Sequence, residues 1–308
     1  MSIFEPISLL INDCFIKIPQ VIGKDTNSYY YKNVYSIEQS IMVIREKLRS
    51  DKPCMIGRLG TTECQTVYKY LHKKYGLPTG SPIMGVLCNN SGFFPNDERL
   101  WKRFAEIMIS SMKYADIQAV LYSGGGENYL IKNYASEATL IPNRSLDPIY
   151  GWSDVLEGKK VLVVHPFEKT INYQYENNRT QIYPATNILP EFQLSTIRAV
   201  QTLAGSVDTR FETWFDALDY MTEEISKKDF DIAILGCGAY GYPLAARIKQ
   251  MGKKSIHMGA ASQLLFGIMG QRWEDDSRIT SWVNGAWRRP MDSERIENFR
   301  QVENGCYW

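Results

Sequence analysis

Residues 231–241 read Asp-Ile-Ala-Ile-Leu-Gly-Cys-Gly-Ala-Tyr-Gly, and this stretch decides the fold class. Its apolar run, 232–235, predicts a strand buried on both faces, as the strands of a parallel sheet are. The glycines that follow fit the pattern G-x-G-x-x-G, which connects a strand to a helix in nucleotide-binding α/β folds. A helix that includes residues 244–249 completes the unit. The stretch therefore predicts a strand, a tight turn able to hold a phosphate, and a helix.

The same alternation of strand and helix recurs along the chain. Short apolar runs predict further strands at 54–56, 119–122, 161–164 and 254–259. Helical spacing of apolar residues predicts helices at 62–74, 98–113, 167–176 and 214–227. We therefore expect an α/β fold with a Rossmann-like, mostly parallel sheet flanked by helices.

The composition divides the chain into three parts. Residues 1–50 are expected to form an N-terminal helical or irregular segment, 51–271 the α/β core, and 272–308 an aromatic-rich C-terminal appendage. A turn-rich stretch at 140–158 marks where two halves of the core would meet. Because disordered tails seldom contain as many tryptophans as the appendage does, we expect it to pack against the core.

Charge and hydropathy exclude several classes of protein. The 308 residues include 35 Lys and Arg against 34 Asp and Glu, so the formal net charge of +1 gives no reason to expect a nucleic acid as partner. No run approaches the roughly 20 apolar residues that a membrane-spanning helix needs, although peripheral contact with a membrane stays open. Scattered cysteines and the lack of a signal-peptide pattern predict a cytoplasmic protein.

Ligands of open α/β sheets bind at the carboxyl ends of the strands, so the loops there are the candidate site. After the first strand, residues 57–63 read Gly-Arg-Leu-Gly-Thr-Thr-Glu. Thr61 or Thr62 is expected to cap the helix that follows, with Glu63 in its first turn. This block is either a simple helix start or a site in which Arg58 binds a phosphate and Glu63 a metal ion, a sugar hydroxyl or a proton.

Two further loops contain candidate residues. Gly124, Gly125 and Gly126 free the backbone to hold an anion, or simply form a flexible turn into a helix. His165, followed by Glu168, stands at the end of the strand predicted at 161–164. A histidine at such a position is either a structural hydrogen-bond donor or a catalytic group.

The late glycine turn is a candidate phosphate site through Gly238, Tyr240 and Gly241, or a place where a helix packs closely on a strand. As a nicotinamide dinucleotide fingerprint it lacks the acidic residue expected about 20 positions further on. The next predicted strand contains His257 instead. A site for a diphosphate is therefore favoured over a site for NAD.

Two blocks resemble bacterial glycosyltransferases of the GT-D fold, and the resemblance covers roughly residues 52–271. One block is 56–63, and the other is 231–241 with the strand after it. In that family the first block typically reads R-[FL]-G-D-G-E, and its D-x-E pair is associated with a divalent metal ion and the diphosphate of a nucleotide sugar. Arg58, Gly60 and Glu63 match this pattern, whereas Thr61 stands where the family has Asp.

The resemblance implies an enzyme that transfers a sugar from a nucleoside diphosphate, such as a UDP-sugar, to a hydroxyl of a glycan or lipid-linked glycan. Such enzymes belong to surface polysaccharide or glycoconjugate synthesis, in the cytoplasm or at the inner membrane surface. A single carboxylate, Glu63, is still compatible with Mg²⁺ or Mn²⁺. The candidate donor-binding residues are Arg58, Gly60, Thr61, Gly124, Gly125, Gly126, Gly238, Tyr240, Gly241 and His257.

Sugar transfer with inversion needs a base for the acceptor hydroxyl, and Glu63, His165 and Glu168 are the candidates. Two other hypotheses stay open. One is a Rossmann-type enzyme that binds a different nucleotide or dinucleotide. The other is a catalytically degenerate binding protein, in which Thr61 marks the loss of activity.

Overall fold

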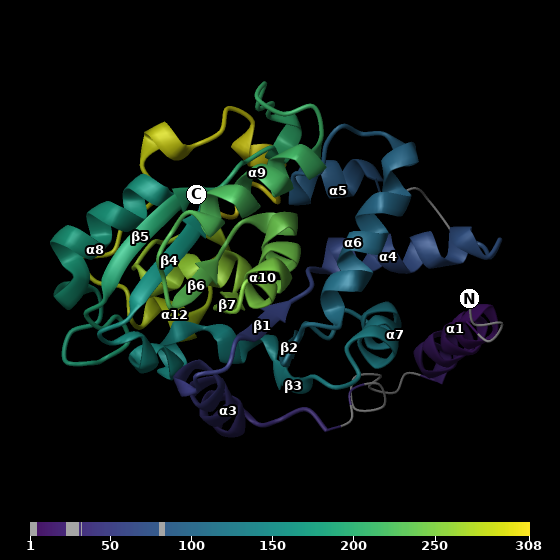
Figure 1. The fold of residues 1–308 in the computed structure, drawn as a ribbon, viewed down its shortest axis with the longest axis horizontal. Helices are drawn as coiled ribbons and strands as arrows, with labels where there is room; N and C mark the ends of the chain where they lie inside the picture. The colour runs from purple at the N-terminus through teal and green to yellow at the C-terminus, as the bar shows by residue number, and fades with distance from the viewer. Residues whose placement is uncertain (1–4, 23–30, 32, 80–83) are drawn as a thin grey trace.

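The computed structural model describes residues 5–22, 31, 33–79 and 84–308 and confirms the predicted α/β fold. Seven strands form one sheet in the order β3-β2-β1-β7-β6-β4-β5, and each neighbouring pair is parallel. Helices lie on both sides of the sheet (Figure 1). The strands are β1 (Cys54–Arg58), β2 (Ile117–Val120), β3 (Thr139–Pro142), β4 (Lys160–His165), β5 (Gln193–Arg198), β6 (Ile232–Leu235) and β7 (Lys254–His257).

The helices follow the predicted alternation. They are α1 (Glu5–Ile22), α3 (Ile37–Arg49), α4 (Thr61–Lys74), α5 (Met84–Ser91), α6 (Trp101–Met112), α7 (Gly125–Tyr134), α8 (Glu168–Ile182), α9 (Trp214–Ser226), α10 (Gly241–Gln250), α11 (Ser262–Leu265) and α12 (Ser277–Thr280). Among the described residues, no helix is long and apolar enough to cross a membrane.

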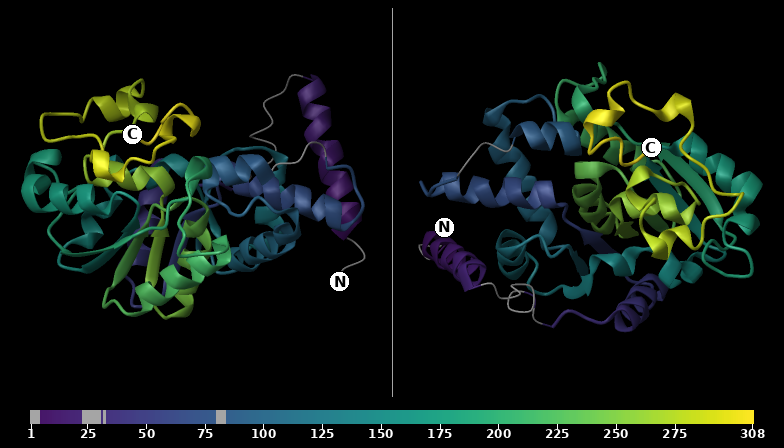
Figure 2. Two further views of the ribbon diagram at one scale, coloured as in Figure 1. Left: turned by 90° about the horizontal axis from the view of Figure 1, so that it is seen from above. Right: turned by 180° about the vertical axis from the view of Figure 1, so that it is seen from behind.

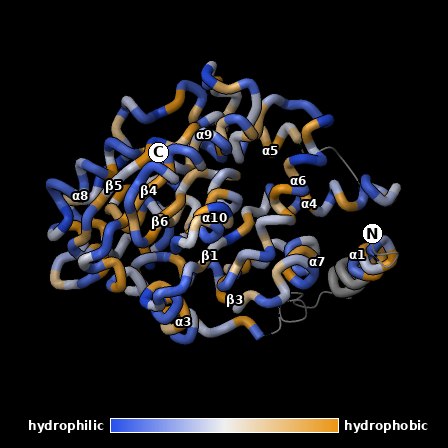
Figure 3. Tube along the Cα trace, in the orientation of Figure 1, coloured by the Kyte–Doolittle hydropathy of each residue, from blue (hydrophilic) through white to orange (hydrophobic). Residues whose placement is uncertain are grey.

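Alternate residues of the central strands face two different hydrophobic clusters. In β4, Leu162 and Val164 join the cluster that contains residues of α4, α6, α9 and α10. Val161 and Val163 join the cluster that contains residues of α3, α8 and the C-terminal segment. Both faces of β4 are therefore covered, which explains its continuous apolar sequence. The hydropathy colouring shows the same apolar character in β4 and β6 (Figure 3).

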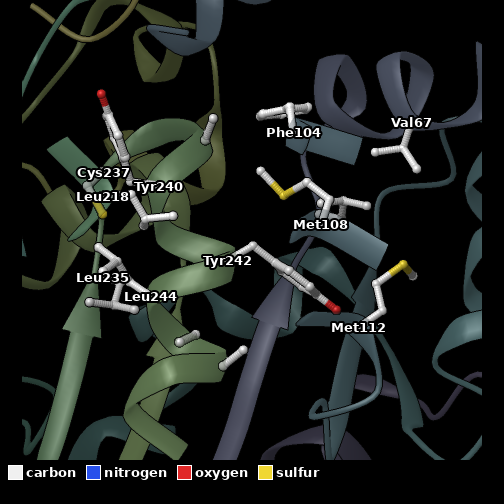
Figure 4. Packing of buried hydrophobic residues seen from close by; sticks show 14 of the residues in the cluster. Val67, Phe104, Met108, Met112, Leu218, Leu235, Cys237, Tyr240, Tyr242 and Leu244 are labelled. Atoms are coloured by element: carbon white, nitrogen blue, oxygen red, sulfur yellow. The ribbon is translucent and has the colours of Figure 1, made fainter. Parts of the chain in front are cut away.

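Strand β2 begins and ends two residues earlier than the sequence pattern predicts. The start differs because Gln118 is polar and interrupts the apolar run. Its side chain is nevertheless fully buried, and its Oε1 accepts a hydrogen bond from the Tyr242 hydroxyl at 2.6 Å. Tyr242 extends from α10 toward Met108 and Met112 of α6 (Figure 4). At the other end, Tyr122 has a φ of 55°, so the chain has left the extended conformation.

Strands β3 and β5 were not predicted, and both lie at the edges of the sheet. β5 is mostly half-buried or exposed, because an edge strand need not be apolar on both faces. β3 overlaps the start of the turn-rich stretch 140–158, whose remainder forms mainly short 3₁₀ helices. β7 hydrogen-bonds to β1 on one side and to β6 on the other, so the sheet is continuous across the expected meeting of two halves.

The C-terminal segment packs on the sheet, as expected for the aromatic-rich appendage. Trp273, Trp287 and Trp308 are all buried, and the two views of Figure 2 place the segment beside α8 and far from α1. Buried Glu294 accepts hydrogen bonds from the backbone N–H groups of Lys169 at 2.7 Å and Thr170 at 3.1 Å. A carboxylate of the appendage therefore caps the start of α8.

The chain leaves β4 and β6 in opposite directions. α8 leads from β4 out to the edge strand β5, whereas α10 leads from β6 back to β7. Ile171 of α8 and Leu244 of α10 belong to the two different hydrophobic clusters, so these helices cover opposite faces. The loops after β4 and β6 therefore separate, and this is the topological switch point at which open α/β sheets bind ligands.

Candidate active site

A cavity of about 250 Å³ lies at this switch point. Leu235, the last residue of β6, lies opposite both His257 of β7 and Val164 of β4. The parallel register thus aligns the ends of neighbouring strands, and their terminal residues meet around one space. The cavity residues supplied by these strand ends are Arg58 (β1), His257 (β7), Gly236 (after β6) and His165 (β4).

The structure brings about half of the predicted site residues together. Those that line the cavity are Arg58, Gly60, Thr61, Glu63, His165, Gly238 and His257. Those that lie outside its lining are Glu168, Gly124, Gly125, Gly126, Tyr240 and Gly241. The first block and the strand ends thus form one site, whereas the loop at 124–126 belongs to another part of the fold.

Four glycines leave room for the polar side chains of the site. A methyl group on Gly60 would lie 2.0 Å from Oε2 of Glu63, and one on Gly259 would lie 2.1 Å from a terminal nitrogen of Arg58. A methyl group on Gly236 would lie 2.5 Å from Cδ2 of His165, and one on Gly241 would lie 2.1 Å from Cε1 of His257. The glycines therefore permit a close approach of side chain to backbone, which any Cβ would prevent.

Arg58 is a cation with an unsatisfied donor. Its Nε is buried and has no hydrogen-bond partner among the described residues, and burial lowers its pKa. A buried unpaired N–H is costly, and the five N–H donors of a guanidinium suit carboxylate or phosphate oxygens. Arg58 is therefore placed to bind an anion that enters the cavity.

His165 is held as a single neutral tautomer. Its Nδ1 accepts a hydrogen bond from the backbone N–H of Phe167 at 2.9 Å, so the ring proton is on Nε2. Burial lowers the pKa of His165 to about 3, and the ring is uncharged at neutral pH. In this state Nε2 can donate a hydrogen bond but cannot accept a proton, which disfavours the predicted role as a base.

His257 is held as the opposite tautomer. Its Nδ1 lies 3.2 Å from the carbonyl oxygen of Leu235, which can only accept, so Nδ1 carries the proton and Nε2 has a lone pair. The pKa of His257 is lowered to about 3, mainly by burial and to a smaller extent by the positive charge of Arg58. His257 therefore offers an acceptor rather than a charge.

Neither threonine caps the helix that begins at the first block, contrary to the prediction. The N-cap is Gly60, without a side-chain cap, and Thr61 and Thr62 belong to the first turn of α4. The buried Glu63 carboxylate lies directly over Gly60. The side chain at the third helical position thus occupies the space in which a capping side chain would stand, near the favourable N-terminal end of the helix dipole.

The backbone just before the predicted loop at 124–126 already binds a carboxylate of the protein itself. The buried carboxylate of Glu127 accepts hydrogen bonds from the backbone N–H groups of Leu121 at 2.8 Å and Ser123 at 3.0 Å. It also accepts one from the Tyr31 hydroxyl at 2.6 Å. These contacts favour the alternative that this loop is a strand-to-helix turn.

Two other predicted residues also have partners away from the cavity. Glu168 accepts a hydrogen bond from the Thr196 hydroxyl at 2.9 Å. The ring of Tyr240 stacks on Trp214 at 4.9 Å between centroids. These contacts favour structural roles for both residues.

The C-terminal segment supplies cavity residues that were not predicted, namely Arg272, Glu303 and Tyr307. Arg272 donates to Glu303 at 2.8 Å, and its guanidinium carbon lies 4.6 Å from the centre of the Tyr307 ring. No local pattern marks these residues, because only the return of the chain to the sheet brings them to the cavity. Their one sequence signal is the unusual density of aromatic and charged residues in the segment.

The resemblance implies a bound Mg²⁺ or Mn²⁺, but the residues present do not fit a metal ion held by the protein. Thr61 offers a hydroxyl where the family has a carboxylate. In the part of the chain that the structure describes, no three His, Cys, Asp or Glu side chains gather to hold a metal. Of the two carboxylates lining the cavity, Glu303 is paired with Arg272.

No family model and no curated protein matches the chain. Two solved structures are similar to it, both of a domain of unknown function 1792. One, described as having a distinct glycosyltransferase fold, has 10% identity and a TM-score of 0.46, and the match covers 91% of this chain and 92% of that one. The other, a selenomethionine-substituted form, has 11% identity and a TM-score of 0.42, with coverages of 77% and 81%. At this level of similarity, a function has to be argued from the cavity itself.

Proposed function

We propose that the protein is a glycosyltransferase that moves a sugar from a nucleoside diphosphate to a hydroxyl acceptor. The observation that carries this proposal is Arg58, a cation with an unsatisfied donor, in a cavity at the switch point of a Rossmann-like sheet. Phosphate groups bind at that position in open α/β sheets. The sequence block around Arg58 and Glu63 supports the same class of reaction through its resemblance to GT-D enzymes.

Each polar side chain of the cavity would have a separate role in such a transfer. Arg58 would bind the diphosphate, and the Nε2–H of His165 would donate to a diphosphate or leaving-group oxygen. In an inverting transfer, Glu63 would take the proton of the acceptor hydroxyl while that oxygen bonds to the anomeric carbon. The bond from the anomeric carbon to the diphosphate oxygen breaks, and the nucleoside diphosphate leaves with the bonding pair.

The donor, the acceptor and the cellular location are also proposals. A UDP-sugar is the first donor to test, and a glycan or lipid-linked glycan is the expected acceptor. This chemistry would serve surface polysaccharide or glycoconjugate synthesis in the bacterial cytoplasm or at the inner membrane surface. Dinucleotide binding is less favoured, because β7 ends in His257 where an acidic residue would bind the ribose.

The test is a panel of UDP-, GDP-, CMP- and dTDP-sugars, with NAD(P) and S-adenosylmethionine alongside. A ligand that binds the native protein raises Tm by mass action, and donor hydrolysis then reports chemistry. Glu63→Gln should abolish turnover of the donor that binds while keeping its affinity. Glu106→Gln, an exposed carboxylate of α6, is the matched control. Stabilisation by a dinucleotide alone would contradict the proposal, and donor binding without turnover would favour a degenerate binding protein.

A further inference from the structure

We propose that Arg58 and Arg272 together bind the diphosphate of the donor, and that they do so in place of a divalent cation. This inference rests on the proposed function and extends it to the charge chemistry of the site. Arg58 ends β1, whereas Arg272 lies in the 3₁₀ helix Gln271–Trp273 near the other end of the chain. Both side chains line the cavity.

Arg58 and Arg272 both line the same cavity of about 250 Å³. Burial is the largest cause that lowers the pKa of Arg58; the nearby Tyr307 and Glu63 oppose this effect, and the positive charge of Arg272 adds to it to a smaller extent. Like charges that share a small cavity repel, and an anion bound between them removes that repulsion. The pair is thus arranged for an anionic ligand that contacts both guanidinium groups.

The donors of Arg58 are free to turn to such a ligand. Its Nε has no partner among the described residues. The backbone around it is shaped for the guanidinium, since Gly259 has a φ of 59° and no Cβ to displace it. A planar guanidinium with free N–H groups binds two phosphate oxygens at once.

Arg272 is oriented by the C-terminal segment. Its backbone N–H donates to the carbonyl oxygen of Cys306 at 3.1 Å, and its guanidinium lies over the ring of Tyr307. It forms an ion pair with Glu303, whose side chain is 51% exposed and therefore able to move toward solvent. A phosphate group of the ligand would replace the Glu303 carboxylate as the ion-pair partner of Arg272.

A divalent cation fits this arrangement poorly. It would have to share the cavity with two guanidinium groups, and of the two carboxylates in the lining, Glu303 is paired with Arg272. Arginine neutralises phosphate charge without a metal ion, through charge-assisted hydrogen bonds. The two guanidinium groups would therefore supply the positive charge that a metal ion would otherwise bring to the diphosphate.

The experiment is isothermal titration calorimetry with inorganic pyrophosphate, which carries the diphosphate common to nucleoside-diphosphate donors, in buffer containing EDTA. Wild type should bind, and Arg58→Met and Arg272→Met should each weaken binding at least about tenfold, the usual effect of losing hydrogen bonds to a charged group. Glu303→Gln should tighten binding, because the competing carboxylate is gone. Arg99→Met, an arginine with a 90% exposed side chain, should bind as wild type does.

The same titrations with UDP, in EDTA and in Mn²⁺, separate the two proposals. Equal affinity in both buffers supports the arginine pair, and binding that requires Mn²⁺ overturns it. Unchanged pyrophosphate binding by a folded Arg272→Met protein also overturns it. If the arginine pair binds pyrophosphate but no nucleotide sugar is turned over, the proposed function fails and the anion site stands. If transfer occurs only with Mn²⁺, the function stands and this inference fails.

Discussion

His165 ends β4 and His257 ends β7, on either side of β6, and the two rings are held as opposite tautomers. The first accepts at Nδ1 from the backbone N–H of Phe167, and the second donates from Nδ1 to the carbonyl oxygen of Leu235. One ring therefore presents a donor at Nε2 and the other an acceptor. A bound ligand meets a fixed pattern of hydrogen-bonding groups that carries no charge.

This pattern predicts the nitrogen spectra of the two rings. Long-range ¹H–¹⁵N correlation spectra should show neutral rings at pH 7, with the proton on Nε2 of His165 and on Nδ1 of His257. The chain has three histidines, so His165→Gln and His257→Gln proteins assign the signals, and His72 is an internal control. A charged ring, or the same tautomer at both sites, would contradict the structure.

The same two residues predict acid sensitivity of the fold. Their pKa values are about 3 in the folded protein against about 6.5 when unfolded. The unfolded chain thus binds more protons between these values, so stability is complete above about pH 6.5 and falls as the pH drops toward 3. Each histidine contributes up to about 1.4 kcal/mol per pH unit in that window. Urea unfolding of wild type and of His165→Gln from pH 7 to pH 4 should show a shallower loss in the variant.

Gly60→Ala should impair donor turnover with little effect on stability. The φ of Gly60 is −64°, which alanine accepts, but the new methyl group would displace the Glu63 carboxylate. We expect kcat/KM to fall at least about tenfold, since a misplaced catalytic group loses its contacts in the transition state. Gly285→Ala, where nothing lies within 4 Å of the added methyl, is the control. Full activity of a folded Gly60→Ala protein would remove Glu63 from the mechanism.

Arg58→Met should stabilise the ligand-free protein while it weakens anion binding. Methionine replaces a poorly paired cation by an apolar chain of similar shape, and such replacements stabilise by about 1 kcal/mol or more. For a chain of this size we expect Tm to rise by roughly 2 °C. Differential scanning calorimetry without ligand checks this, and a marked fall in Tm would show that Arg58 has a structural partner.

Glu294→Ala should destabilise the attachment of the C-terminal segment to α8. The lost carboxylate accepts from the N–H groups of Lys169 and Thr170 and from the Thr170 hydroxyl. Loss of a charged cap from a buried helix start costs about 3 kcal/mol. Hydrogen exchange should increase first in residues 168–171. Glu297→Ala, an exposed position in the same segment, should leave exchange unchanged.

The local sequence was sufficient for the buried central strands and for the strand-end position of several site residues. β6 matches its predicted bounds, because a strand covered on both faces has an uninterrupted apolar run. β3 and β5 were not predicted because an edge strand pairs on one side only and tolerates polar residues, so that its sequence lacks a continuous apolar run. The start of β2 was not predicted because Gln118 is polar, and its burial depends on a hydrogen bond to a helix more than a hundred residues away.

The sequence by itself determined the α/β class, the strand-ending block with Arg58 and Glu63, and the glycine turn after β6, because each is encoded by neighbouring residues. Only the tertiary structure decided which loops share a cavity. The order of the strands brought His165 and His257, which end β4 and β7 on either side of β6, to one cavity and left Gly124 and Glu168 with other partners. It also brought Arg272 and Glu303 to the site from the far end of the chain. Such contacts depend on the packing of distant segments, which no short stretch of sequence specifies.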